Sequence, residues 1–289
     1  MGEAPIIFGE VLFDCFGDDY VLGGAPFNVA WHLQGFGLAP RFVSRIGRDA
    51  LGDEVRACMR DWGMDTRWLQ TDDTRPTGRV QVTLQDGQPS YDILDRQAYD
   101  AIELPPGLEG AVEGVLYHGS LALRHAPNGA VLQALRGEAR VFLDVNLRPP
   151  WWDVRTLEPL VAEAQWLKLN DEEFGLLASD GETPAEYAAR MGLEAVVLTR
   201  GARGAEVHAG GQCFEAPAPA VADLVDAVGA GDAFSAVTLY GIDRGWSWEQ
   251  ILRRAAGFAA RVCGWRGALS HDRAIYEEMV RDWRGASGD

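Results

Sequence analysis

Short apolar runs alternate with longer stretches of helical period along most of this chain, and this rhythm constrains the fold more than any other feature. The expected strands are residues 5–13, 41–46, 114–118, 140–145, 166–169 and 195–199. Stretches of helical pattern separate them, including residues 25–35 and 51–62. Strands connected through helices predict an α/β fold with a mostly parallel sheet and helices on both of its faces.

One segment departs from this rhythm. Residues 77–84 alternate between polar and apolar with a period of two, and the turn signal Asp86-Gly87 connects them to residues 90–94. We expect this antiparallel ribbon to project from the sheet as a lid over a site. The alternative is an edge hairpin that only extends the sheet.

The C-terminal part reads as helices at residues 232–244, 247–263 and 273–283, and Ser247 with Gln250 forms a capping box. We find no internal repeat and no long linker. A single domain over residues 1–289 is therefore expected.

The charge balance excludes several classes of function. The chain has 43 Asp+Glu against 26 Lys+Arg, a formal net charge of −17, which argues against partners such as nucleic acid or an anionic membrane surface. The acidity is either a solvated surface or an adaptation to a salty cytoplasm, and activity measured across molar salt distinguishes them. Lys168 is the only lysine, so no Walker-A lysine is available elsewhere.

The sequence also indicates the cellular location of the protein and the redox state of its cysteines. No apolar run reaches the roughly 18 residues that span a bilayer, and the N-terminus lacks the pattern of a signal peptide. The cysteines are far apart and form no CxxC pair, which argues against structural zinc and disulfides: Cys15, Cys58, Cys213 and Cys263. We therefore expect a cytoplasmic protein with buried free thiols.

The strongest local motif is the sequence Gly229-Ala230-Gly231-Asp232, which precedes an apolar helix. Glycines leave backbone amides uncovered, and at a helix N-terminus such amides form an anion hole. Asp232 would repel a phosphate bound there. Its presence makes sense if it accepts a proton from a hydroxyl that attacks the phosphate. The alternative is that Asp232 is only an N-cap.

A second motif surrounds Gly23-Gly24 and Asn28, with Asp14 at the end of the first apolar run. Two glycines allow a ligand to approach the backbone, and Asp with Asn suits the hydroxyls of a polyol or sugar. The alternative is a glycine turn followed by a helix cap.

A third motif places Asn170 and Glu173 at a strand-to-helix junction beside Lys168. It fits a capping box without further function, or a phosphate region with Glu173 near hydrated Mg²⁺. Residues 144–148 and 199–201 also follow strands and could contact ligand or be ordinary caps. His118 and His125 lack the spacing of metal ligands and are interpreted as non-ligands.

Together these motifs resemble the PfkB, or ribokinase-like, family of carbohydrate kinases. GGAPFNVAWHLQGFG is similar to the N-terminal signature of the family and DLVDAVGAGDAFSA to its C-terminal signature, with RIGRDALGDEV and KLNDEEF in order between them. LGGAPFNVA, GSLALR, DVNLRPPWW and KLNDEE are most similar to bacterial fructokinases. The resemblance implies a Rossmann-like α/β core and a small β lid formed from about residues 11–24 and 75–98.

The resemblance also implies roles for individual residues in an ATP-dependent sugar kinase. Asp232 becomes the catalytic base, and the amides of Gly229, Ala230 and Gly231 become the anion hole. The other implied roles are sugar binding by Asp14, Gly24, Asn28 and Arg148; ATP binding by Lys168, Asn170, Thr199 and Gly201; Mg²⁺ through water at Glu173; and a monovalent cation such as K⁺ at Asp226 and the carbonyl of Val228. The family often has Thr where this chain has Ala227, so a cation site here would rely on backbone ligands.

The expected reaction is phosphorylation of the 6-hydroxyl of fructose. Within the family, 2-keto-3-deoxygluconate, ribose or a nucleoside is the alternative substrate, and a keto acid would need a cation from Arg45, Arg79, Arg96 or Arg148.

Two further classes of protein fit the sequence less well. A nicotinamide-dependent oxidoreductase would need GxGxxG after the first strand, where this chain has DCFGDDYVLGG. A non-catalytic sugar-binding relative would be expected to lack Asp232. The open edge of the lid also makes a homodimer through the lid an expectation.

Overall fold

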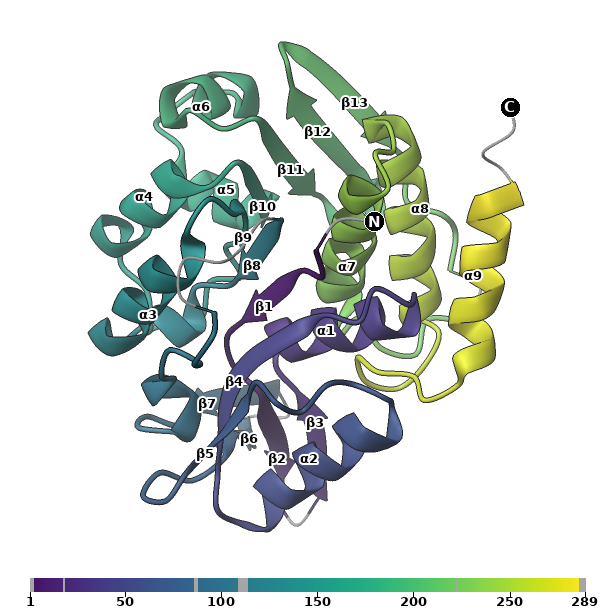
Figure 1. Ribbon diagram of the computed structural model, residues 1–289. Helices are drawn as coiled ribbons and strands as arrows, with labels where there is room; N and C mark the ends of the chain where they lie inside the picture. Colours follow the sequence, from purple (N-terminus) through teal and green to yellow (C-terminus); the bar gives the residue numbers. More distant parts are fainter. Residues whose placement is uncertain (1–2, 18, 86–87, 109–113, 222, 286–289) are drawn as a thin grey trace.

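A nine-stranded sheet forms the centre of the computed structural model, which describes residues 3–17, 19–85, 88–108, 114–221 and 223–285 (Figure 1). The strand order is β13-β12-β11-β10-β9-β8-β1-β4-β5. The pairs from β5 to β11 are parallel, whereas β12 and β13 are antiparallel. The strands are β1 (Ile6–Phe8), β4 (Arg41–Gly47), β5 (Leu69–Asp72), β8 (Val115–His118), β9 (Arg140–Asp144), β10 (Trp166–Asn170), β11 (Ala195–Thr199), β12 (Ala205–Ala209) and β13 (Gln212–Ala216).

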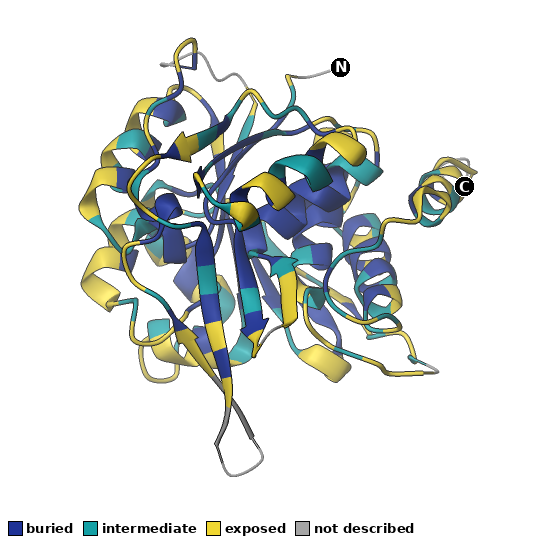
Figure 2. Ribbon diagram, turned by 90° about the horizontal axis from the view of Figure 1, so that it is seen from below, coloured by how far each residue is buried: buried dark blue, intermediate teal, exposed yellow. Residues whose placement is uncertain are grey.

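Helices cover both faces of this sheet, as predicted (Figure 1). One face carries α1 (Ala25–Gly35), α2 (Ala50–Asp61), α7 (Ala230–Asp243), α8 (Trp248–Val262) and α9 (Arg273–Gly285). The other carries α3 (Ala126–Arg136), α4 (Val154–Glu163), α5 (Asp171–Leu177) and α6 (Pro184–Met191). Alternate strand residues point to opposite faces, so Ile7 joins the first apolar core while Ile6 and Phe8 join the second. The outer faces of the helices are exposed (Figure 2).

A separate four-stranded sheet lies beside the main one, in the order β3-β2-β6-β7. Its strands are β2 (Leu12–Phe16), β3 (Asp19–Gly23), β6 (Gly78–Gln85) and β7 (Gln88–Ile93). They fall within the two segments predicted for the lid, and the alternative of a hairpin extending the main sheet is wrong. The predicted turn at Asp86-Gly87 lies outside the described residues.

The first predicted strand is wrong in one respect: residues 5–13 form two strands in different sheets. β1 belongs to the main sheet and β2 to the second sheet. The chain changes direction at Gly9, where φ is 148° and a Cβ atom would lie 2.5 Å from Cγ of Pro26. Only glycine fits this contact, and the change of direction places Glu10 between the two sheets.

Several smaller expectations are corrected by the structure. Asp232 is not the N-cap of α7, since Gly229 takes that position in a left-handed conformation. The strands β5, β12 and β13 were not predicted, because their sequences are short and lack a continuous apolar run. All four cysteines are free, but only Cys15 is buried and Cys213 is exposed. Among the described residues, no helix combines the length and the apolar character needed to cross a membrane.

Three short 3₁₀ helices complete the described elements: Ala98–Ala101, Leu121–Leu123 and Gly201–Arg203. The first two follow the second sheet and β8, respectively, and Leu121 packs with apolar residues of the second sheet. The third follows β11.

Candidate active site

A cavity of about 630 Å³ lies between the second sheet, the residues that follow β1 and β9, and the N-terminus of α7. Its lining includes eight of the residues singled out from the sequence: Asp14, Gly24, Asn28, Arg148, Val228, Gly229, Gly231 and Asp232. The carboxyl ends of parallel strands are where α/β proteins bind ligands. The sequence motifs that are far apart in the chain therefore converge on one cavity.

Asp232 lies in the first turn of α7, facing the cavity. The turn that precedes it requires glycine, because a Cβ atom on Gly229 would lie 2.3 Å from Cβ of Ala268 and φ there is 79°. The side-chain amide of Asn28 donates a hydrogen bond of 2.7 Å to Oδ2 of Asp232. Asn28 is itself buried in α1, so α1 and α7 together fix the orientation of this carboxylate.

The electrostatic surroundings favour proton uptake by Asp232. Desolvation raises its pKa to about 6, and the neighbouring Asp144 adds to this, while the hydrogen bond from Asn28 opposes it. A carboxylate with a pKa near the working pH is a better general base than one with the usual value. At neutral pH the group is mostly ionised and able to accept a proton.

Glu10 is a cavity residue that the sequence analysis missed. It is only 2% exposed, and burial raises its pKa to about 7, with Arg148 opposing the shift. Its Oε2 atom has no hydrogen-bond partner among the described residues. The sequence did contain a signal, because Glu10 is an acidic residue within the apolar run 5–13. Interpreting that run as one strand gave Glu10 no role.

Lys168 is paired inside the protein. Its Nζ lies 2.8 and 3.0 Å from the two carboxylate oxygens of Asp144, and Oγ of Ser235 donates a 2.7 Å hydrogen bond to the same carboxylate. Burial alone would lower the pKa of Lys168, but Asp144 outweighs this effect and raises it. A Cβ atom on Gly231 would lie 3.6 Å from Nζ, so the ion pair supports the first turn of α7 from below.

The other residues predicted for the phosphates lie at the ends of β10 and β11, outside the lining of the 630 Å³ cavity. Asn170 pairs with Thr199 across these strands, and Gly201 begins the short helix after β11 with a φ of 55°. Asn170 and Glu173 form the capping box of α5. Both carboxylate oxygens of Glu173 accept backbone hydrogen bonds, from Leu147 at 2.8 Å and Asn170 at 2.9 Å.

The predicted monovalent-cation residues lie just before α7. The carboxylate of Asp226 accepts hydrogen bonds from the backbone of Val228 at 3.0 Å and of Gly267 at 3.2 Å. In the predicted anion hole, the amide of Ala230 donates a long hydrogen bond of 3.3 Å to the carbonyl of Ala227. This loop is therefore a structured turn that leads directly into the helix.

These features match a known family. The model of the pfkB family carbohydrate kinases matches residues 4–273. This chain belongs to the PfkB family. It is a carbohydrate kinase, an enzyme that transfers a phosphoryl group to an alcohol acceptor.

Individual relatives and solved structures of similar fold narrow the class of substrate further. The chain is 30% identical to a fructokinase of Klebsiella pneumoniae over 259 residues, covering 84% of each chain. It is 29% identical to the aminoimidazole riboside kinase of Salmonella typhimurium over 256 residues, covering 84% of this chain and 80% of that one. A solved but uncharacterised sugar kinase from Pyrococcus horikoshii superposes with a TM-score of 0.81 at 25% identity, over 96% of this chain and 98% of that one. Another structure of that Pyrococcus protein contains ATP. This PfkB kinase therefore acts on a sugar or a nucleoside.

Proposed function

We propose that this PfkB kinase transfers the γ-phosphoryl group of ATP to the 6-hydroxyl of fructose. The observation that carries the proposal is Asp232, a carboxylate with a raised pKa that faces the cavity from the first turn of α7. An acid with a raised pKa beside a helix N-terminus suits proton abstraction from a hydroxyl that attacks an anion held there.

In the proposed reaction, the sugar hydroxyl gives its proton to Asp232 while its oxygen forms a bond to the γ-phosphorus. The bond between that phosphorus and the β,γ-bridging oxygen breaks, and ADP leaves with the electron pair. The amides of Gly229, Ala230 and Gly231 and the dipole of α7 would stabilise the negative charge on the transferred group. Asn28 would keep the carboxylate of Asp232 pointing at the hydroxyl.

The donor set near α5 fits a nucleotide with Mg²⁺. Mg²⁺ prefers hard oxygen ligands and retains several of its waters. Glu173 offers such oxygens in a fixed position, and because both already accept backbone hydrogen bonds, it would act on a metal-bound water. When bound, Mg²⁺ would neutralise phosphate charge. We assign Lys168, Asn170, Thr199 and Gly201 to the ATP side, and Asp226 with the carbonyl of Val228 to a K⁺ site.

The charges of the cavity favour a neutral sugar over a keto acid. Among its described lining residues, three are acidic (Glu10, Asp14 and Asp232) and one is an arginine, Arg148. Of the other arginines considered, Arg45 is paired with Asp72 at 3.1 Å and Glu103 at 2.5 Å, and neither Arg79 nor Arg96 is among the described lining residues. A carboxylate substrate would add a charge that this cavity does not match.

A nucleoside is the second candidate, and one observation favours it. Tyr91 of β7 lines the cavity beside Leu12, Val80 and Ile93, which gives the side of the second sheet an apolar and aromatic lining. A planar nucleobase could stack there over its whole ring, whereas fructose offers only C–H groups to an aromatic face.

A panel of fructose, ribose, 2-keto-3-deoxygluconate, adenosine, inosine and aminoimidazole riboside, assayed by coupled ADP release, tests the proposal. We expect the highest kcat/KM with fructose and a fructose 6-phosphate product. A higher kcat/KM with a nucleoside would replace fructose by the second candidate, and no ADP release with any sugar or nucleoside would contradict the whole assignment.

We also propose that the second sheet acts as the lid and joins two copies of the chain. Phe16, Tyr20, Val21 and Tyr91 are large apolar side chains of this sheet that are exposed. Exposed apolar side chains of this kind favour an interaction surface. Tyr20→Lys combined with Val21→Lys should convert a dimer into a monomer in sedimentation equilibrium. A monomeric parent chain at micromolar concentration would contradict the dimer.

A further inference from the structure

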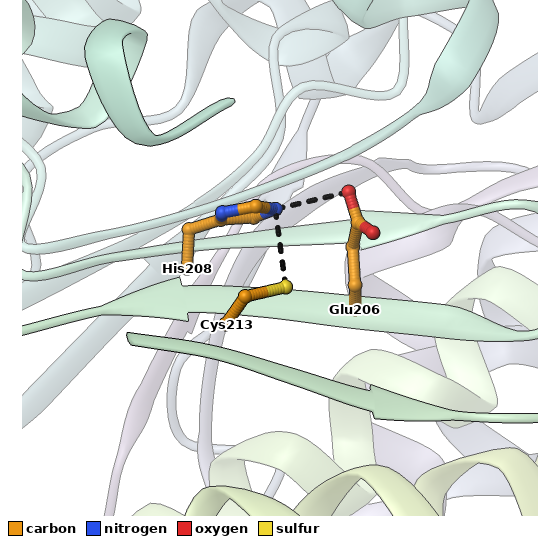
Figure 3. A group of neighbouring side chains, drawn as sticks. All are labelled: Glu206, His208 and Cys213. Carbon is orange, nitrogen blue, oxygen red and sulfur yellow. Dashed lines mark hydrogen bonds and ion pairs between the residues drawn. The ribbon is translucent and has the colours of Figure 1, made fainter. Parts of the chain in front are cut away.

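The hairpin of β12 and β13 brings together three different metal-binding side chains far from the lid. His208 and Cys213 are directly opposite each other in the antiparallel register, and Glu206 precedes His208 by two residues. All three side chains therefore project from the same face of the hairpin, as Figure 3 shows. The mixed set of nitrogen, oxygen and sulfur was not visible in the sequence, because no CxxC or HxxxH spacing marks it.

The donor atoms lie at distances suited to one ion. Nε2 of His208 lies 3.0 Å from Oε1 of Glu206 and 3.8 Å from Sγ of Cys213, and all three donors lie within 4.8 Å of one another. In a tetrahedral zinc site with bonds of about 2.0–2.3 Å, two ligand atoms are roughly 3.3–3.6 Å apart. Small side-chain movements would bring the three donors to that spacing.

We propose that Glu206, His208 and Cys213 form a Zn²⁺ site with a water molecule as fourth ligand. Zn²⁺ accepts thiolate, imidazole and carboxylate together, whereas Mg²⁺ requires oxygen ligands throughout. Glu206 is buried while Cys213 is exposed, so the site is anchored on one side and open to solvent on the other. Three protein ligands with an open fourth position differ from structural zinc sites, in which the protein supplies all four ligands.

Arg200 competes with a metal ion for this site, because its guanidinium donates a hydrogen bond to Oε1 of Glu206. A bound Zn²⁺ would take over that oxygen and release the arginine. Arg200 lies between Thr199 and Gly201, which we assign to the ATP side. The proposed zinc site is therefore placed to change the charge beside the nucleotide loop, although zinc binding itself does not depend on the proposed substrate.

A second cluster, made of Asp95, Asp100 and His125, provides an internal comparison. Asp100 already forms a bidentate ion pair with Arg124, with both distances 2.7 Å, and the cluster contains no sulfur. It would give no thiolate signal with any metal.

The test uses the full chain without a polyhistidine tag, kept reduced. Zn²⁺ binding is measured by calorimetry, and Co²⁺ serves as the spectroscopic probe of thiolate ligation. We expect one Zn²⁺ per chain and a thiolate-to-cobalt charge-transfer band. Cys213→Ser should abolish the band, and His208→Gln should weaken Zn²⁺ binding by at least ~10-fold, since even residues that only support a ligand cost that much.

Matched controls make the result specific. Cys58→Ser and His125→Gln should retain both the band and the affinity, because these residues lie outside the cluster. Arg200→Gln should bind Zn²⁺ more tightly, since the competing guanidinium is gone. Absence of a charge-transfer band in the parent chain, or unchanged Zn²⁺ affinity in folded Cys213→Ser and His208→Gln, would overturn the proposal.

Discussion

Asp144 and the three acidic residues of the cavity lie at the same end of the main sheet, but their charges are neutralised to very different degrees. Asp144 is held by Lys168, by Ser235 and by a longer hydrogen bond of 3.4 Å from the hydroxyl of Tyr117. Glu10, Asp14 and Asp232 share the cavity with Arg148 as their nearby arginine and Asn28 as a hydrogen-bond donor to Asp232. Asp144 therefore belongs to a satisfied ion pair, whereas Glu10, Asp14 and Asp232 lack a full counter-charge.

This comparison distinguishes an ion pair that supports α7 from carboxyl groups that are suited to proton transfer. Burial raises the pKa of Glu10, Asp14 and Asp232 because no full counter-charge offsets it. Lys168, the only lysine, is paired with Asp144 beneath α7 and lowers the pKa of Asp232 only as a secondary influence. Raised pKa values are typical of groups that exchange protons in catalysis.

The largest effect is expected from removing the base. Asp232→Asn preserves the size of the side chain but cannot accept the proton, so kcat should fall by about 10²–10⁴-fold. Sugar affinity, measured by calorimetry without ATP, should change little. Near-normal turnover in this variant would show that proton abstraction by Asp232 is not required.

Breaking the satisfied pair should lower the free energy of unfolding, in addition to any effect on the ATP binding that we assign to Lys168. Lys168→Met leaves the buried Asp144 without its counter-ion, and such a loss costs about 3–5 kcal/mol of unfolding free energy. Urea denaturation measures this loss. The double variant Asp144→Asn with Lys168→Met removes both charges and should recover most of it; a double variant as unstable as Lys168→Met would show that the ion pair is not the cause.

Removing Glu10, a buried acid without a full counter-charge, should increase the free energy of unfolding. The pKa of Glu10 is raised from 4.5 to about 7 in the folded protein, so the parent chain loses stability as pH rises between these values. Glu10→Gln should therefore be more stable than the parent at pH 8, by on the order of 3 kcal/mol, and by less than about 1 kcal/mol at pH 5. Equal differences at both pH values would mean that the charge of Glu10 is not the cause.

Local patterns in the sequence predicted much of this protein. Helix α1 has the predicted bounds Ala25–Gly35, because Pro26 favours a first turn and the apolar spacing continues to Gly35. The motifs around Asp14, Asn28 and Asp232 were each visible, and the α/β rhythm correctly implied that parallel strands bring such ends together.

The features that sequence reasoning missed depend on packing between distant segments. Gly9 redirects the chain because of its contact with Pro26, and an apolar run alone cannot show where it divides between two sheets. The burial of Glu10 follows from that division. The pairing of Lys168 with Asp144 depends on the register of two strands that are far apart in the chain. The pairing of His208 with Cys213 follows from the two-residue turn Gly210-Gly211, a local hairpin signal that the sequence analysis did not use.

The pH dependence of kcat/KM for the sugar tests most directly the claim that Asp232 is an under-neutralised base. Because the base must be ionised, activity should fall tenfold per pH unit below an apparent pKa near 6 and level off above it. The fall should persist in Glu10→Gln, which assigns it to Asp232 rather than to the other acid with a raised pKa. An activity that stays constant down to pH 4.5, or a fall that disappears in Glu10→Gln, would contradict the account.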